Sequence, residues 1–221
     1  MYGTRWIDKL ERKIGKHTIH NLMTYIVAGM SVVFVLDYFV YAQNEVSFGS
    51  FIIFDRDAVM SGQVWRLLSF VFFPPDFSPI FIIFSLYLYW LIGTSLERAW
   101  GSFKFNFYYI CGIIGAVISG MITGYATNVY LNLSLFLAFS IIYPDYELLI
   151  FFFLPIKVKY LAILDAAGLI FLLIVDSWPG KLALLFAMFN LILFFGGDFI
   201  NRIKNIYRRY KFRRDSNAYR R

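Results

Sequence analysis

The residues of this sequence that could do covalent chemistry are few and widely spaced. A serine hydroxyl becomes a nucleophile when an adjacent base takes its proton, and Ser134 with Lys181 is a pair that could act in this way. Each of the two lies in or at the end of an apolar segment. A lysine at the end of a membrane span usually extends its ammonium group to the interface instead. We therefore expect no catalytic residue, and keep a serine–lysine protease as the alternative.

Histidine and cysteine chemistry is restricted by number and position. The histidines of the sequence are His17 and His20, both in a polar, basic segment near the start. Cys111 is its single cysteine, which rules out an intramolecular disulfide and a thiolate zinc cluster. We predict no metal site and no cofactor.

Polar residues inside the apolar segments are the other candidates, because such groups are costly in a membrane and often functional. Asn132, Ser134 and Asn190 are candidates for the polar lining of an interior groove. The favoured alternative is plainer: Asn132 and Asn190 form hydrogen bonds between helices, while Asp37 and Asp165 lie close enough to span ends to be hydrated.

These side chains must be positioned by a membrane bundle. Hydrophobic residues make up 60% of the 221 residues and charged residues only 16%, whereas a soluble domain has about 25% charged residues. Uncharged runs separate short polar clusters, which is typical of membrane spans. We predict six spans, at Leu22–Tyr41, Pro79–Ser95, Phe105–Tyr125, Val129–Tyr143, Tyr160–Val175 and Leu182–Phe195.

Several connections have features of their own. The stretch 42–65 contains an apolar cluster, which indicates a folded or interface-lying loop. Residues 67–73 stop at Pro74–Pro75. They are too short to cross a hydrocarbon core of about 30 Å. Residues 148–154 end at Pro155, and we expect them to dip into the interface. The fourth span, at about 1.5 Å per residue, covers only about 22 Å, so it must thin the bilayer or be shielded by its neighbours.

The positive charges predict the orientation. With six spans, 18 of the 21 Lys and Arg residues fall on the face that carries both termini, and Arg56, Arg66 and Lys181 fall on the other. The positive-inside rule then places both termini in the cytoplasm. We expect a plasma membrane if the source is a prokaryote and the endoplasmic reticulum if it is a eukaryote.

Three parts follow from these boundaries: a basic cytoplasmic segment at 1–21, a six-helix membrane domain at 22–200 and a basic cytoplasmic tail at 201–221. The tail carries nine basic residues with interleaved aromatic ones, a composition that also occurs in nucleic-acid binders. A basic run directly after a span is more often a topology anchor that attracts anionic lipid headgroups. We therefore predict membrane lipid, and no nucleic acid, as its partner.

Three sequence segments, in order over about residues 60–165, carry a resemblance to a known family. They are Gln63-Val-Trp65-Arg66-Leu, then Gly93-x-x-x-Glu97-x-x-x-Gly101, and then Ala138-Phe-Ser-Ile-Ile-Tyr-Pro144-Asp with the following Leu154-Pro-Ile-Lys. They resemble the first loop, the junction of the second and third spans, and the end of the fourth span in the rhomboid superfamily, derlins included. The resemblance implies a six-transmembrane rhomboid-like helical bundle.

The matched residues have structural interpretations in such a fold. The guanidinium of Arg66 can bridge backbone carbonyls or lipid phosphate. Glu97 can accept hydrogen bonds from a facing loop, and Gly101 permits a tight turn. Gly112, Gly115, Gly120 and Gly124 lie along the third span. Gly120 and Gly124 have small-xxx-small spacing, and we expect the stretch to let a neighbouring helix approach closely.

The catalytic residues of the rhomboid proteases are missing. The resemblance implies a serine at the start of the fourth span, in Gly-x-Ser-Gly, and a histidine on the sixth. The register places the serine at Asn128 or Val129, and the sequence has no histidine in any span. It therefore predicts a pseudoprotease. By resemblance to the derlins, we expect it to bind transmembrane segments of client proteins in membrane protein quality control or trafficking.

Overall fold

The computed structural model describes residues 5–44, 47–75, 78–150 and 154–195. Five of its apolar helices are long enough to cross a membrane, and a sixth is shorter. They are α2 (Leu22–Asn44), α5 (Pro79–Trp100), α6 (Ser102–Thr123), α7 (Val129–Ile142), α8 (Val158–Val175) and the last described helix, Trp178–Phe195. The prediction of an all-α, multi-pass membrane bundle with six apolar helices is thus confirmed.

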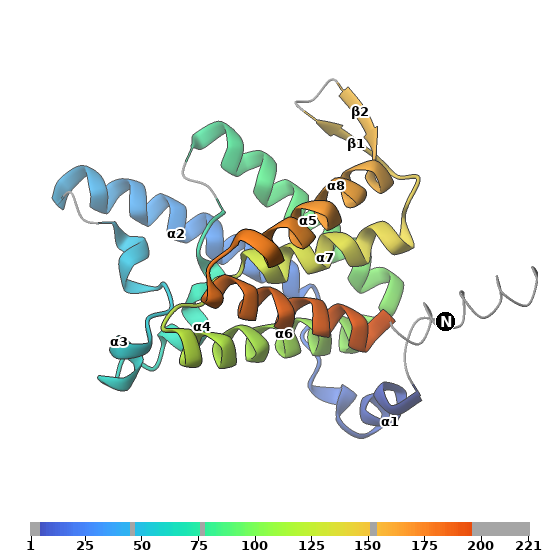
Figure 1. Ribbon diagram of the computed structural model, residues 1–221, viewed down its shortest axis with the longest axis horizontal. Coiled ribbons are helices and arrows are strands. Elements are labelled where there is room, and N and C mark those ends of the chain that lie inside the picture. Colours follow the sequence, from blue (N-terminus) through green and yellow to red (C-terminus); the bar gives the residue numbers. More distant parts are fainter. Residues whose placement is uncertain (1–4, 45–46, 76–77, 151–153, 196–221) are drawn as a thin grey trace, which may run out of the picture.

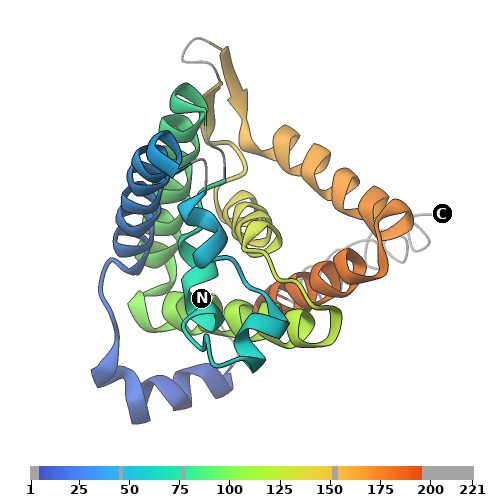
Figure 2. The ribbon, with the colours of Figure 1, turned by 90° about the vertical axis from the view of Figure 1, so that its left-hand side faces the viewer.

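The short helix α7 occupies the middle of the bundle. Figure 2 looks along the long axis of Figure 1 and shows the longer helices arranged around α7. Helix α7 has 14 residues. The helical rise gives it a length of about 21 Å, which is less than a bilayer core of about 30 Å. The neighbouring helices shield it, as its shortness requires.

The connection from α2 to α5 is folded, as predicted. It contains η2 (Phe48–Phe51), α3 (Arg56–Met60), α4 (Arg66–Ser69) and η3 (Phe70–Phe72). Asp37, near the end of α2, accepts hydrogen bonds from the Ser47 hydroxyl at 2.7 Å and the Gly49 N–H at 2.9 Å. The prediction that Asp37 is hydrated was wrong: its side chain is 8% exposed and holds the start of this connection.

The opposite end of the bundle carries α1 (Arg5–Ile14) and η1 (Gly15–His17). Ile7 of α1 is fully buried in the main hydrophobic core. We call this end of the bundle the α1 end; the positive-inside rule predicts that it is cytoplasmic.

The described ends of the apolar run, 148–150 and 154, lie in the two strands of a β-hairpin, a structure that the sequence pattern did not predict. Strands β1 (Glu147–Ile150) and β2 (Leu154–Lys157) pair antiparallel, with Glu147 opposite Lys157. The pairing satisfies the backbone groups of a segment too short to cross the membrane as a helix. Figure 2 shows the hairpin between α5 and α8.

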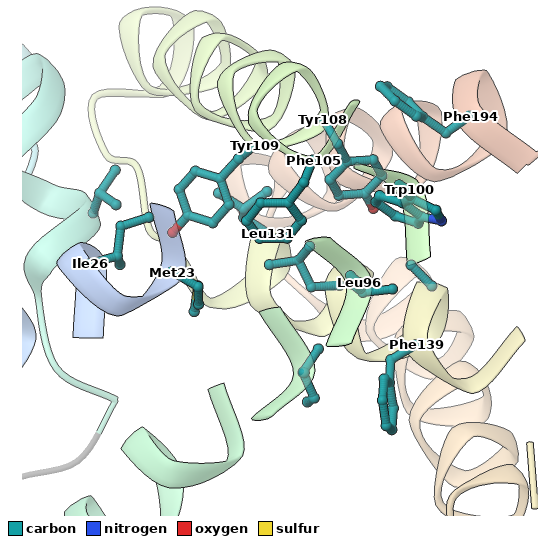
Figure 3. Close-up of a cluster of buried hydrophobic side chains, with 14 of the residues drawn as sticks. Met23, Ile26, Leu96, Trp100, Phe105, Tyr108, Tyr109, Leu131, Phe139 and Phe194 are labelled. Atoms are coloured by element: carbon teal, nitrogen blue, oxygen red, sulfur yellow. The ribbon is translucent and has the colours of Figure 1, made fainter. Parts of the chain in front are cut away.

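The core is densest where α5 meets α6. The Trp100 ring lies 5.4 Å from that of Tyr108 and 6.2 Å from that of Phe194, centroid to centroid. Figure 3 shows Phe105, Tyr108 and Trp100 together, with Phe194 approaching from the last described helix. Buried aromatic pairs of this kind contribute about 0.5–1.5 kcal/mol each beyond the area that they bury.

The span boundaries differ modestly from those predicted. The second span continues beyond Ser95 to Trp100, because Leu96 and Glu97 are buried in the bundle despite the charge. The third begins at Ser102, and Gly124 ends it. The predicted basic tail at 201–221, with its affinity for anionic lipid, lies outside the described residues.

Candidate functional site

Asn128 precedes α7 at the position that the resemblance assigns to a nucleophile. Its side chain is 3% exposed. The amide nitrogen donates hydrogen bonds to the carbonyl oxygens of Val71, at 3.0 Å, and Phe73, at 2.9 Å. These carbonyls end η3, directly before Pro74–Pro75. The side chain therefore ties the start of α7 to the first loop, and its amide offers no hydroxyl or thiol to a substrate.

The histidines lie at the other end of the bundle. His20 Nδ1 is 3.1 Å from the hydroxyl of Ser102, the first residue of α6. Helix α6 then runs for 22 residues before the chain reaches Asn128. At the helical rise this is a distance of about 33 Å. No histidine of this sequence can serve as a base at the start of α7.

Ser134 belongs to a buried network of hydrogen bonds. Its hydroxyl accepts a hydrogen bond from the Tyr108 hydroxyl at 2.9 Å and donates one to the Leu131 carbonyl at 2.7 Å. The amide of Asn190 donates to the carbonyl oxygen of Tyr108 at 3.1 Å. Tyr108 thus joins α6, α7 and the last described helix, and the expected interhelical hydrogen bond of Asn190 is present.

Lys181 lies close enough to Asp176 for its charge to act on that carboxylate. It lies in the first turn of the last described helix. Hydrogen bonds from the Tyr130 hydroxyl, at 2.8 Å, and from the Ser177 N–H hold the pKa of Asp176 below its usual value, and Lys181 contributes to this. Ser134 bonds with Tyr108 and Leu131, and no hydrogen bond joins its hydroxyl to Lys181 among the described residues.

Asn132 stands apart from this network. It is 4% exposed, and neither its amide oxygen nor its amide nitrogen has a hydrogen-bond partner. Tyr89 of α5 faces it, outside hydrogen-bond geometry. Asn132 thus approaches a polar group of a neighbouring helix, as predicted, but forms no well-aligned hydrogen bond with it. Unsatisfied buried amides are costly, about 1–3 kcal/mol per group, and are explained by strain, water or a ligand.

Asp165 has a related arrangement in α8. The helix begins at Val158. The helical rise puts Asp165 about 10 Å along it. Its Oδ2 atom is buried and has no hydrogen-bond partner. The prediction that Asp165 is hydrated near a span end was wrong, because the side chain is half-buried within the bundle.

Arg66 organises the first loop. Its Nη1 donates to the carbonyl oxygens of Ser50, at 2.9 Å, and Ile53, at 2.8 Å, and its Nε donates to Gln63 Oε1 at 2.7 Å. Of the two expected roles, the structure shows the bridging of carbonyls. Trp65 is half exposed and donates from its indole nitrogen to the Phe51 carbonyl at 3.2 Å.

The second motif fastens the α1 end of the bundle. Oε1 of Glu97 accepts hydrogen bonds from the Asn21 N–H at 2.8 Å and the Ser102 hydroxyl at 2.6 Å, as expected of this residue. Gly101 adopts φ 87°, which favours glycine at the turn between α5 and α6. At Gly93 an added Cβ would overlap Met23, so this glycine lets α2 approach α5.

Three glycines of α6 lie in close contact with neighbouring segments, and a fourth, Gly124, ends the helix. An added Cβ at Gly112 would overlap Leu131 of α7, and one at Gly115 would lie 3.2 Å from Phe186 of the last described helix. At Gly120 it would lie 2.6 Å from the Phe54 ring of the first loop. The close approach of neighbouring helices along these glycines is confirmed at Gly112 and Gly115. Gly124 takes no part in it, because it has φ 94° and ends the helix.

Pro144 ends the fourth span and begins the turn to the hairpin. Its carbonyl oxygen accepts a hydrogen bond from the Lys159 N–H at 3.1 Å. The neighbouring Asp145 pairs with the Lys159 ammonium at 2.8 Å, and this contact holds the pKa of Asp145 below its usual value. The turn thus joins the end of α7 to the start of α8.

Two features of the site could not be found from the sequence. The hydrogen bond of Tyr108 to Ser134 could not be predicted, since nothing in the sequence marks which tyrosine hydroxyl lies beside a serine. The role of Asn128 depends on the path of the first loop, which sequence spacing does not give. Among the residues that the structure describes, no group of three or more His, Cys, Asp or Glu side chains could hold a metal ion.

Comparison with known proteins agrees with this geometry. A family model described as Rhomboid domain matches residues 61–195, more than half of the chain. No curated protein and no solved structure matches. The match covers the first-loop motif and every apolar helix from α5 to the last one described.

Proposed function

Because the chain belongs to the rhomboid family, we propose that it is a non-catalytic, derlin-like member that binds transmembrane segments of client proteins. Its place would be membrane protein quality control or trafficking. The single observation that carries the proposal concerns Asn128, which lies at the expected position of the nucleophile. Its amide nitrogen donates both of its hydrogens to carbonyl oxygens of the first loop. A rhomboid scaffold without nucleophile or base retains a bundle that meets other spans but lacks the means to cut them.

The binding part of the proposal rests on unsatisfied polar groups inside the bundle. The amide of Asn132 and one carboxylate oxygen of Asp165 have no hydrogen-bond partner. In a membrane, a polar residue of a client span also lacks partners, because lipid tails offer none. An amide or carboxylate that is already desolvated would stabilise such a client by forming the missing hydrogen bond.

The side of the bundle at α8 supports entry of a client. Of the 18 residues of α8, Val158, Ala162 and Leu169 are buried, and most of its large apolar side chains are exposed. The hairpin, rather than a long helix, stands between α5 and α8 (Figure 2). Opening this side disrupts less packing than separating α5 from α6, whose aromatic side chains interlock.

The short α7 adds a second physical contribution. At about 21 Å it is shorter than the bilayer core, and its neighbours shield it; if α8 moves aside to admit a client, lipid beside the uncovered α7 would be thinned. A thinner bilayer lowers the cost of accommodating a span that is short or weakly hydrophobic. Such spans are the ones that quality control must recognise.

Photocrosslinking in reconstituted vesicles tests the proposal. A client span with one central asparagine is compared with the same span carrying leucine, in thin and thick bilayers. We expect several-fold greater capture of the asparagine span, most of all in thin bilayers, and loss of this preference in Asn132→Leu.

Ser134→Ala is the matched control for that experiment. It removes a buried hydroxyl that is bonded to both Tyr108 and Leu131, so it should lower stability and leave the preference for the asparagine span unchanged. Equal capture of the two spans by the wild-type protein would contradict the proposal.

A further inference from the structure

A polar pocket lies at the α1 end of the bundle, away from Asn128 and from the buried network around Tyr108. Its volume is about 500 Å³. The walls come from the start of α2, the last turns of α5 and the turn into α6; they are formed by His20, Asn21, Thr24, Trp90, Thr94, Glu97, Arg98, Gly101 and Ser102. The pocket is open and mixed in polarity, unlike the apolar cavity beside the hairpin.

Glu97 is the unusual group in this pocket. The residue is 7% exposed, and both of its hydrogen bonds, from Asn21 and Ser102, go to one oxygen, Oε1. The other oxygen, Oε2, is buried and has no hydrogen-bond partner. A buried carboxylate with one oxygen that accepts no hydrogen bond is a site at which an ammonium group would be stabilised.

Arg98 gives the same pocket a positive group. Arg98, the next residue of α5, is exposed, and no carboxylate within the described part of the chain pairs with it. His20 lies across the turn, with Nδ1 at 3.1 Å from the Ser102 hydroxyl. A ligand that fits must therefore present an ammonium group to Glu97 and an anionic group, such as phosphate, to Arg98.

The position of the pocket indicates where such a ligand comes from. Thr24, Trp90 and Thr94 belong to membrane-spanning helices, and Trp90 is 39% exposed on the outer surface of α5. Thr24 is the third residue of α2 and Arg98 lies in the last turn of α5, so the pocket is at the ends of these two spans, where lipid headgroups lie. A lipid in the adjacent leaflet can place its headgroup in the pocket while its chains lie along α2 and α5.

We propose that this pocket binds the headgroup of an aminoalkyl phospholipid such as phosphatidylethanolamine. The ammonium group donates to Oε2 of Glu97, and the phosphate accepts from the Arg98 guanidinium. Phosphatidylcholine, whose trimethylammonium group has no N–H, cannot form the bond to Glu97. Free phosphoethanolamine shares the headgroup chemistry but lacks the chains that hold the lipid against α2 and α5.

Native mass spectrometry of the full chain in detergent tests this site, with phosphatidylethanolamine and phosphatidylcholine added at equal concentration. We expect wild-type protein to retain phosphatidylethanolamine about tenfold over phosphatidylcholine, the factor that one charge-assisted hydrogen bond gives. Glu97→Gln should abolish the preference, whereas Glu147→Gln, at an exposed glutamate of the hairpin, should keep it. Equal retention of the two lipids by the wild-type protein overturns the proposal.

Two further arms keep the test decisive. If Glu97→Gln fails to fold, two other variants replace it: Arg98→Gln, at an exposed position, and Thr94→Leu, which fills the pocket. Unchanged retention of phosphatidylethanolamine in both variants overturns the site. Soluble phosphoethanolamine and inorganic phosphate are added as competitors. Displacement of the lipid by either competitor at equal concentration would show a soluble ligand and overturn the assignment to a lipid.

Discussion

The side-chain nitrogen of Asn128 lies 3.0 Å from the carbonyl oxygen of Val71, and this hydrogen bond joins the start of α7 to the end of the first loop. A second bond from the same nitrogen reaches Phe73. One amide thereby satisfies two carbonyls ahead of Pro74–Pro75, at the place where a rhomboid protease would carry its nucleophile. We expect this position to serve the fold and not a reaction.

Asn128→Asp should strongly destabilise the protein. The substitution keeps the shape of the side chain but replaces two donated hydrogen bonds by carboxylate oxygens that face carbonyl oxygens. At about 1–3 kcal/mol for each unsatisfied buried group, the free energy of unfolding should fall by roughly 2–6 kcal/mol. Unfolding in mixed micelles measures it.

Thr127→Ala is the matched control for that variant. It removes a longer, local hydrogen bond from the Val129 N–H to the Thr127 hydroxyl. Loss of a capping hydroxyl of this kind should cost less than about 2 kcal/mol. Equal destabilisation by the two substitutions would contradict the role given to Asn128.

Gly112→Ala should separate α6 from α7. The added methyl group would overlap Leu131, and overpacking of this kind costs about 1–3 kcal/mol. Gly168→Ala is the matched control, because nothing lies within 4 Å of a Cβ at that glycine of α8. The control should be neutral or stabilising by up to about 1 kcal/mol. Equal thermal unfolding midpoints for the two variants would contradict this packing.

Arg66→Lys should loosen the first loop although it keeps the charge. The guanidinium bridges the Ser50 and Ile53 carbonyls while also bonding Gln63, and a lysine ammonium cannot reproduce this fork. Hydrogen exchange should rise over residues 47–72. Arg56→Lys, at an exposed position beside Asp57, should leave exchange unchanged, and a similar rise in both variants would count against the bridging role.

The turn after α7 should weaken on acidification. Lys159 holds the pKa of Asp145 below its usual value. The contact therefore contributes above the unfolded-state pKa and is lost as pH falls through the lowered, folded-state pKa. Asp145→Asn should remove this pH dependence from the hairpin's hydrogen exchange. A wild-type hairpin whose exchange protection is the same on both sides of that transition would contradict the ion pair's role.

A fluorophosphonate probe should not label the protein at Ser134. The hydroxyl is buried and hydrogen-bonded to Tyr108 and Leu131, and no hydrogen bond joins it to Lys181 among the described residues. Peptide mapping of treated protein gives the answer directly. An adduct at Ser134 that disappears in Lys181→Ala would establish the serine–lysine alternative and overturn the non-catalytic account.

Much of the fold could be predicted from hydrophobic length. The apolar helices lie where uncharged runs occur, because a membrane leaves few other structures for such runs. The hairpin could not be predicted in this way, since a short apolar run does not distinguish strand from helix by periodicity. Its pairing of Glu147 with Lys157 depends on two segments meeting across a turn.

The candidate site was predicted less completely. Spacing identified Arg66, Glu97 and Gly101, whose roles are local to a turn or loop. It grouped Asn132 with Ser134 and Asn190 because all three are polar in spans, whereas the structure bonds Ser134 and Asn190 to Tyr108 and leaves Asn132 unpaired. Which face of a helix meets a partner depends on helix rotation and tilt, and these are set by packing across the whole bundle.

The most direct test of the central claim is the mass of a client span after photocrosslinking to the wild-type protein in vesicles. Binding without cleavage predicts an adduct whose mass is that of the intact client plus the protein, stable over hours of incubation. A client fragment with a new terminus, formed by the wild-type protein and absent with Ser134→Ala, would contradict the account.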